Sequence, residues 1–134
     1  MAMLLPWYLF LFVGAFDWGF YAHALISTES AARVAALYAS ASTSNANDST
    51  GICTYALQEL KISPNVNTSI TCPATTLPVI VSNNGGPVSG ASSPDGQPAV
   101  KVSVTYKTVG VIPIPGLLEK QATFYREVWM RLRG

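Results

Sequence analysis

The stretch from Met3 to Ile26, MLLPWYLFLFVGAFDWGFYAHALI, is almost entirely apolar and holds one charged side chain, that of Asp17. About 20 helical residues, each rising about 1.5 Å, cross a bilayer hydrocarbon core of about 30 Å. The run before Asp17 is slightly too short to do this, whereas the stretch that includes Asp17 is long enough. We therefore predict a membrane-spanning helix that ends near residue 26.

Asp17 is the most informative residue of this stretch. A carboxylate in the bilayer interior costs several kcal/mol unless it faces protein, water or a cation. Two interpretations follow. Asp17 marks the outer edge of a span that ends there, or it is satisfied only when subunits assemble and a neighbour supplies an amine or another hydrogen-bond donor. The sequence leaves both open.

The helical pattern continues beyond the apolar stretch. Ser27–Ser40, STESAARVAALYAS, contains no Gly or Pro and is rich in alanine, the best helix former. Glu29 and Arg33 have the spacing and order of a favourable helical ion pair. A second, milder apolar face is formed at helical spacing by Val34, Leu37 and Tyr38. We predict one helix from about Met3 to Ala41, ended by the turn-rich sequence ASTSNANDSTG.

Small residues recur along this helix every fourth position, a spacing that lets helix backbones approach closely in membranes and bundles. Such pairs are Ala15 with Gly19 and Ala32 with Ala36. The alternative, which applies most to the half beyond the apolar stretch, is that alanine is simply common in helices. The predicted helix–helix assembly residues are Ala15, Asp17, Gly19, Ala32, Arg33 and Ala36.

A cleaved signal peptide is the competing interpretation of the apolar stretch. Ala22-His23-Ala24 has the small-x-small pattern of a cleavage site, with the cut after Ala24. No Lys or Arg precedes the apolar run, however, and Asp17 falls where that run should still be apolar. A cut after Ala24 would also divide a helical pattern that continues to Ala41.

The two cysteines, Cys53 and Cys72, lie in a region rich in Thr, Ser and Asn. Outside the cytosol such a pair most simply forms a disulfide, worth about 3 kcal/mol for a loop of about 20 residues. Two unrelated buried thiols are the alternative. Because the chain has no CxxC motif and a single His, a four-ligand metal site is not predicted.

Residues 42–134 are predicted to form a small domain outside the membrane. Thr50–Ser63 has apolar residues near helical spacing, which predicts a short helix. Thr76–Ser82 is apolar and β-branched, and Ala99–Val109 alternates strictly between apolar and polar residues, so both are predicted strands. Asn83–Pro98 is rich in Gly, Pro, Ser and Asn and is a predicted loop.

The last segment, residues 118–132, fits both a helical stripe and a strand. Its aromatic and β-branched content favours a strand that pairs with Val100–Val109. The predicted fold class is therefore α+β. A long N-terminal helix, residues 1–41, precedes a small antiparallel β-sheet domain that also contains a short helix.

Composition argues against several classes of function. The net charge is +1, without the basic stripe that nucleic-acid binding requires. An enzyme needs converging titratable groups. Here the single His belongs to the membrane end, and the acids of the outer domain are scattered without a motif: Asp48, Glu59, Asp95, Glu119 and Glu127. No catalytic residue, cofactor or metal is predicted.

Several motifs occur together in this chain. The apolar run has a proline near its start, Pro6, and an acidic-aromatic-glycine step follows at Asp17-Trp18-Gly19. The alanine-rich continuation carries a central arginine, Arg33, and later come VKVSVTY and a Pro-Gly-Leu turn before the last segment. In these motifs the chain resembles the TadE-like family, the minor pilins or pseudopilins of bacterial tight-adherence pili. Residues 45–97 carry no recognisable match.

The resemblance implies a single-pass protein of the bacterial inner membrane, with an extracytoplasmic C-terminal domain, that acts in pilus assembly or at the pilus tip. The implied partners are other pilin or pseudopilin subunits, contacted through the N-terminal helix, together with membrane lipid and the pilus assembly machinery. The family's leader, with its basic residues, cleaved glycine and following glutamate, has no counterpart in the printed residues, so no processing site is assigned.

The competing function is a membrane-tethered or secreted small binding module. Its site would lie in the Asn83–Pro98 loop or among three aromatic residues, Tyr106, Tyr125 and Trp129. Such aromatic residues more often belong to a sheet core or to cross-strand pairs.

Overall fold

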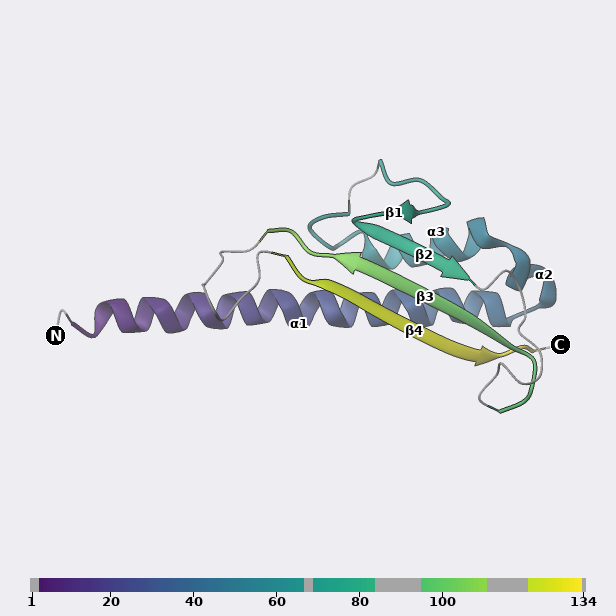
Figure 1. The fold of residues 1–134 in the computed structure, drawn as a ribbon, viewed down its shortest axis with the longest axis horizontal. Helices are drawn as coiled ribbons and strands as arrows, with labels where there is room; N and C mark the ends of the chain where they lie inside the picture. The colour runs from purple at the N-terminus through teal and green to yellow at the C-terminus, as the bar shows by residue number, and fades with distance from the viewer. Residues whose placement is uncertain (1–2, 67–68, 84–94, 111–120, 134) are drawn as a thin grey trace.

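The computed structural model describes residues 3–66, 69–83, 95–110 and 121–133. These residues form a long helix, two shorter helices and a four-stranded antiparallel sheet of order β1-β2-β3-β4. The α+β fold predicted from the sequence is confirmed. Figure 1 shows the elements α1 (Leu5–Ser40), α2 (Thr43–Asn47), α3 (Ser49–Leu60), β1 (Thr75–Thr76), β2 (Val79–Asn83), β3 (Ala99–Lys107) and β4 (Thr123–Arg131).

The first helix passes behind the sheet and then projects from the domain toward the N-terminus (Figure 1). It contains 36 residues, so its length is about 54 Å. Pro6 lies in its first turn, where the missing backbone N–H costs least. The predicted continuous helix from about Met3 to Ala41 is confirmed, and Ala41 is its C-cap.

The face of α1 that packs on the domain consists of small side chains. Beyond Asp17, its buried residues are Ala24, Thr28, Ala31, Ala32, Ala35, Ala36, Ala39 and Ser40. The larger buried side chains come from the facing side of β3, with Val100, Val102, Val104 and Tyr106. Because an alanine side chain extends little beyond the backbone, α1 lies close to β3 and β4, and it also packs against α3.

The apolar side chains noted in the second half of α1 lie outside this packed face. Leu37 is 55% exposed, and Val34 is partly buried. Tyr38 contacts α3 instead, with its ring centroid 4.6 Å from that of Tyr55. Its hydroxyl donates a hydrogen bond of 2.9 Å to Oδ2 of Asp48.

Asp48 caps the N-terminus of α3. Its Oδ1 accepts a hydrogen bond of 3.0 Å from the backbone N–H of Gly51. That bond, followed by the bond from the Tyr38 hydroxyl, holds the pKa of Asp48 below its ordinary value. A side chain at position 51 would collide with Asp48 and with the ring of Tyr38, so glycine is required for this close approach.

The segment predicted to end the first helix contains a short helix of its own. Ser42 accepts a hydrogen bond of 3.1 Å from the backbone N–H of Asn45 and so caps α2. This local capping by serine explains why a segment rich in turn formers still contains one helical turn. The predicted short helix within Thr50–Ser63 is confirmed as α3, which begins at Ser49 and ends at Leu60.

The predicted strand Thr76–Ser82 is two strands, β1 and β2, separated by Leu77-Pro78. Proline has no N–H for a strand ladder, and this explains the interruption. The final segment contains a strand, as the sequence favoured: β4 pairs with β3 from Ala99 opposite Arg131 to Lys107 opposite Thr123. Most of the predicted Asn83–Pro98 loop and residues 118–120 lie outside the described residues.

The predicted disulfide between Cys53 and Cys72 is confirmed. Cys53 is buried within α3, and Cys72 lies in the segment that leads into β1. The disulfide therefore connects α3 to the segment that enters the sheet at β1.

We expect Ala35→Leu to lower the free energy of unfolding by about 1–3 kcal/mol, because added methylene groups overpack a closely packed interface. Ala35 is 0% exposed. Ala22 lies on the exposed side of the same helix, so Ala22→Leu should change stability by less than about 0.5 kcal/mol. Urea unfolding of the full chain in detergent micelles measures both. Equal effects would contradict the alanine packing described here.

Candidate functional site at the projecting end of α1

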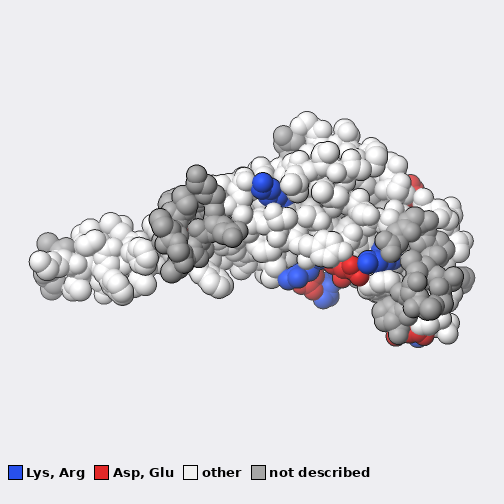
Figure 2. All heavy atoms as spheres, viewed as in Figure 1, with Lys and Arg blue, Asp and Glu red and all other residues white. Residues whose placement is uncertain are grey.

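The projecting half of α1 exposes many large apolar side chains. Leu5 is 63% exposed, Tyr8 68% and Phe12 70%. In the face shown in Figure 2, the coloured charged side chains lie over the domain, and the projecting end shows none. By length and composition α1 is suited to cross a membrane, and the most apolar part of it is mostly exposed. A continuous exposed surface of large apolar side chains on a folded protein marks contact with lipid or with another protein.

Asp17 is buried, with only 2% of its surface exposed. Among the described residues, none gives its Oδ2 a hydrogen bond. A buried carboxylate oxygen without a donor is costly, because the lost hydration is not replaced. The structure thus places a carboxylate in need of a donor at the point where the helix leaves the domain.

Ala15 and Gly19 lie on the exposed surface of α1. Within the part of the chain that the structure describes, a Cβ added at Gly19 would meet no atom within 4 Å, so the surface there is open. Residues two apart in an α-helix point about 200° away from each other around the helix axis. Asp17 is two residues from both Ala15 and Gly19, so it lies on nearly the opposite side of α1. The sequence grouped these three residues together, and the structure separates them onto two faces.

Ala32 and Ala36, which the sequence also assigned to helix–helix assembly, are both 0% exposed in the chain's own core. Their small size serves the packing of α1 within its own domain, and they are not on the surface of the folded chain. Arg33 is exposed and forms the predicted ion pair with Glu29, with 2.6 Å between Nη2 and Oε1. An exposed pair of this kind contributes little to stability.

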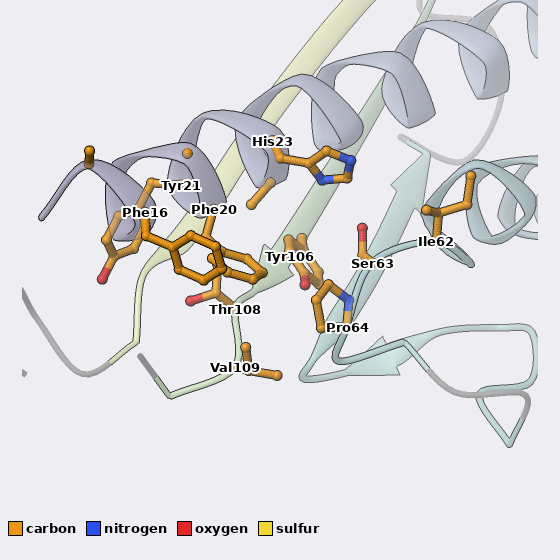
Figure 3. Close-up of a pocket in the computed structure, with 13 residues that line it drawn as sticks. Phe16, Phe20, Tyr21, His23, Ile62, Ser63, Pro64, Tyr106, Thr108 and Val109 are labelled. Carbon is orange, nitrogen blue, oxygen red and sulfur yellow. The ribbon is translucent and has the colours of Figure 1, made fainter. Parts of the chain in front are cut away.

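A pocket of about 440 Å³ lies in the angle between the projecting half of α1 and the domain (Figure 3). Its walls come from α1 between Ala15 and Ala24, from residues 62–64 after α3, and from residues 106–109 at the end of β3. Figure 3 shows the rings of Phe16 and Phe20 directed from α1 toward the end of β3. The sequence did not predict this pocket, because segments distant in the chain form it.

The aromatic residues considered for a binding module lie in two different environments. Tyr106 is 1% exposed and belongs to the core, and burial raises the pKa of its hydroxyl. Tyr125 and Trp129 lie on the other side of the sheet, beside Glu127. Each donates a hydrogen bond of 2.7 Å to that carboxylate.

Lys101 completes this cluster on the outer face of the sheet. Its Nζ lies 2.9 Å from Oε2 of Glu127 and 5.2 Å from the centre of the Trp129 ring. The hydroxyl of Tyr125 and then the amine of Lys101 hold the pKa of Glu127 below its ordinary value. The carboxylate of Glu127 on β4 therefore binds Lys101 on the neighbouring strand β3. This is the cross-strand contact expected for such residues.

Within the described ranges, no three His, Cys, Asp or Glu side chains are grouped so that they could hold a metal ion. Comparison of the chain with protein-family models, with curated proteins and with solved structures found no match. The candidate site is therefore defined by geometry: an exposed apolar helix, a buried carboxylate and a pocket at their junction with the domain.

Acid should weaken the sheet through Glu127. Its pKa in the folded chain lies below the ordinary 4.5, so the stability it adds is complete above that value and is lost as the pH falls through the folded pKa. We expect Glu127→Gln to flatten the fall in stability between about pH 5 and about pH 3. Tyr125→Phe, which removes one of the bonds, should give an intermediate slope. Chemical unfolding at a series of pH values measures this, and identical slopes in all three proteins would contradict it.

Proposed function

We propose that this chain is a membrane-anchored structural subunit of a pilus-like assembly, a minor pilin or pseudopilin of the TadE-like kind. The projecting half of α1 lies in lipid, and the sheet domain lies outside the membrane. One observation carries the proposal: a single helix is apolar and exposed in its first half and is built into the domain core in its second half. A rigid connection of this kind fixes the domain relative to whatever surrounds the exposed half.

The proposed location is the inner membrane, with the domain on the extracytoplasmic side. The disulfide between Cys53 and Cys72 supports an oxidising compartment for the domain. The described residues before Asp17 carry no charge, as a lipid-embedded segment requires. The proposed partners are sister subunits, the pilus assembly machinery and the lipid itself.

Retention of the projecting half is favoured over cleavage after Ala24. The ring of Tyr21 lies against that of Phe124 on β4, with 6.3 Å between their centroids. Asp17, further upstream, is already buried. A cut after Ala24 would remove these packed residues together with the exposed ones, so a signal peptide accounts less well for the packing.

The helix–helix contact is proposed to use Ala15 and Gly19, the small pair that is open on the surface. Asp17, on the opposite side, is covered in the isolated chain, so its missing donor is proposed to come from a partner once assembly uncovers it. Ala32 and Ala36 have no part in this contact because the domain already covers them.

Gly19→Leu should reduce association between subunits at least about tenfold, because the added side chain prevents close approach of a second helix. The folded chain should tolerate it, since no atom of the described residues lies within 4 Å of the added Cβ. Gly14 is equally open and lies about 140° around the helix, so Gly14→Leu is the matched control. Crosslinking of the full chain in native membranes measures association. Normal association of both variants would show that the helix is only a tether.

Asp17→Ala should leave the isolated chain at least as stable as before, because it removes a buried carboxylate oxygen that lacks a donor among the described residues. The same change should abolish incorporation into complexes, because the partner's donor then loses its acceptor. Thermal unfolding in detergent and co-purification from membranes measure the two effects. A large loss of stability with normal incorporation would assign Asp17 to the fold and not to assembly.

A further inference from the structure

We propose that the pocket at the junction of α1 and the domain binds an acyl chain of a bilayer lipid, so that the base of the domain rests at the membrane surface. This inference rests on the proposed membrane anchor and concerns the subunit before assembly. Its starting point is the pocket of about 440 Å³, a volume within the range of about 300–1,000 Å³ usual for small-molecule sites.

The length of the projecting helix sets the depth of the pocket in the bilayer. About 20 helical residues cross the hydrocarbon core, and a span that begins at Leu5 then ends at Ala24. The α1 wall of the pocket runs from Ala15 to Ala24. This wall therefore runs from about the middle of the hydrocarbon layer to its outer edge, where acyl chains surround it.

The chemistry of the pocket fits a hydrocarbon chain. Phe16 and Phe20 form one side and are 60% and 41% exposed, so they are accessible to the surroundings of the helix. Ile62, on the domain side, is 82% exposed and adds an apolar side chain to the lining. Next to lipid acyl chains, the exposure of Ile62 carries no cost.

Two lysines belong to the segments that form the pocket, although neither lines it. Lys61 directly precedes Ile62, and Lys107, whose side chain lies on the other face of β3 from Tyr106, directly precedes Thr108. Both lysines belong to the end of the domain from which α1 projects, since α3 and β3 end there (Figure 1). Lysine side chains near a membrane surface extend their amines toward lipid phosphates.

The acyl chain and a sister helix use the pocket at different stages. Ala15 and Gly19 belong both to the pocket wall and to the proposed helix contact. Lipid covers them while the subunit is stored in the membrane, and the sister helix displaces that lipid on assembly.

The test uses the full chain in vesicles of phosphatidylethanolamine and phosphatidylglycerol that contain a phospholipid with a diazirine on its acyl chain. A low ratio of protein to lipid keeps the chain unassembled. After irradiation, fragmentation of peptides locates the lipid adducts. We expect adducts on α1 and also on residues 62–64 and 106–109. Ile62→Glu should reduce the domain adducts about tenfold, whereas Leu37→Glu, an equally polar change at another exposed site, should leave them unchanged.

The outcomes separate the two proposals. Adducts confined to residues 5–20 would overturn lipid binding in the pocket and leave the membrane anchor intact. Absence of adducts from the whole chain would overturn the anchor and the pocket together. Adducts on residues 62–64 and 106–109 that persist unchanged in Ile62→Glu would also overturn the pocket proposal, because the acyl chain would then not lie beside Ile62.

Discussion

The close packing of an alanine-lined helix face on the sheet is the interaction on which the rest of the structure depends. Alanine side chains of α1 meet the valines and the tyrosine of β3, so the bulk of the interface comes from the strand and the proximity comes from the helix. Because the large apolar residues of α1 are not needed for this interface, they remain on its outer surface and in its projecting half. One helix can therefore serve two environments without a break.

The junction between these environments concentrates the unusual features of the molecule. Asp17 is buried there without a donor to Oδ2 among the described residues, and the pocket opens on another side of the helix within the same turns. Both features lie where α1 passes from the domain to its projecting half. Side chains next to the domain are covered on one side and exposed on the other, so small differences in position along α1 produce large differences in burial.

Within the domain, hydrogen bonds, a disulfide and an ion pair that lie away from this junction hold the helices and strands together. Asp48 joins the start of α3 to Tyr38 of α1, and the disulfide joins α3 to the chain entering β1. Glu127 links Lys101 on β3 to the aromatic residues of β4. With its titratable and aromatic groups engaged in these contacts, the outer face of the sheet offers less to a ligand than the projecting end does.

The sequence by itself determined the elements whose cause is local. The long helix follows from its apolar first half and from an alanine-rich second half that contains no Gly or Pro. The strand β3 follows from strict alternation, and the Glu29–Arg33 pair from its spacing. The disulfide followed from cysteine number and composition. The split of β1 from β2 at Leu77-Pro78 and the capped turn of α2 were missed, because short proline and serine effects were outweighed by the composition of the surrounding segment.

Only the tertiary structure decided which face of α1 is internal. Periodicity finds large apolar side chains, and here the internal face is made of alanines, which are equally common on helix surfaces. Ala32 and Ala36 are therefore core residues, whereas the similar pair Ala15 and Gly19 is exposed. The pocket was equally beyond the sequence, because α1, the end of α3 and the end of β3 meet only after the sheet has packed on the helix.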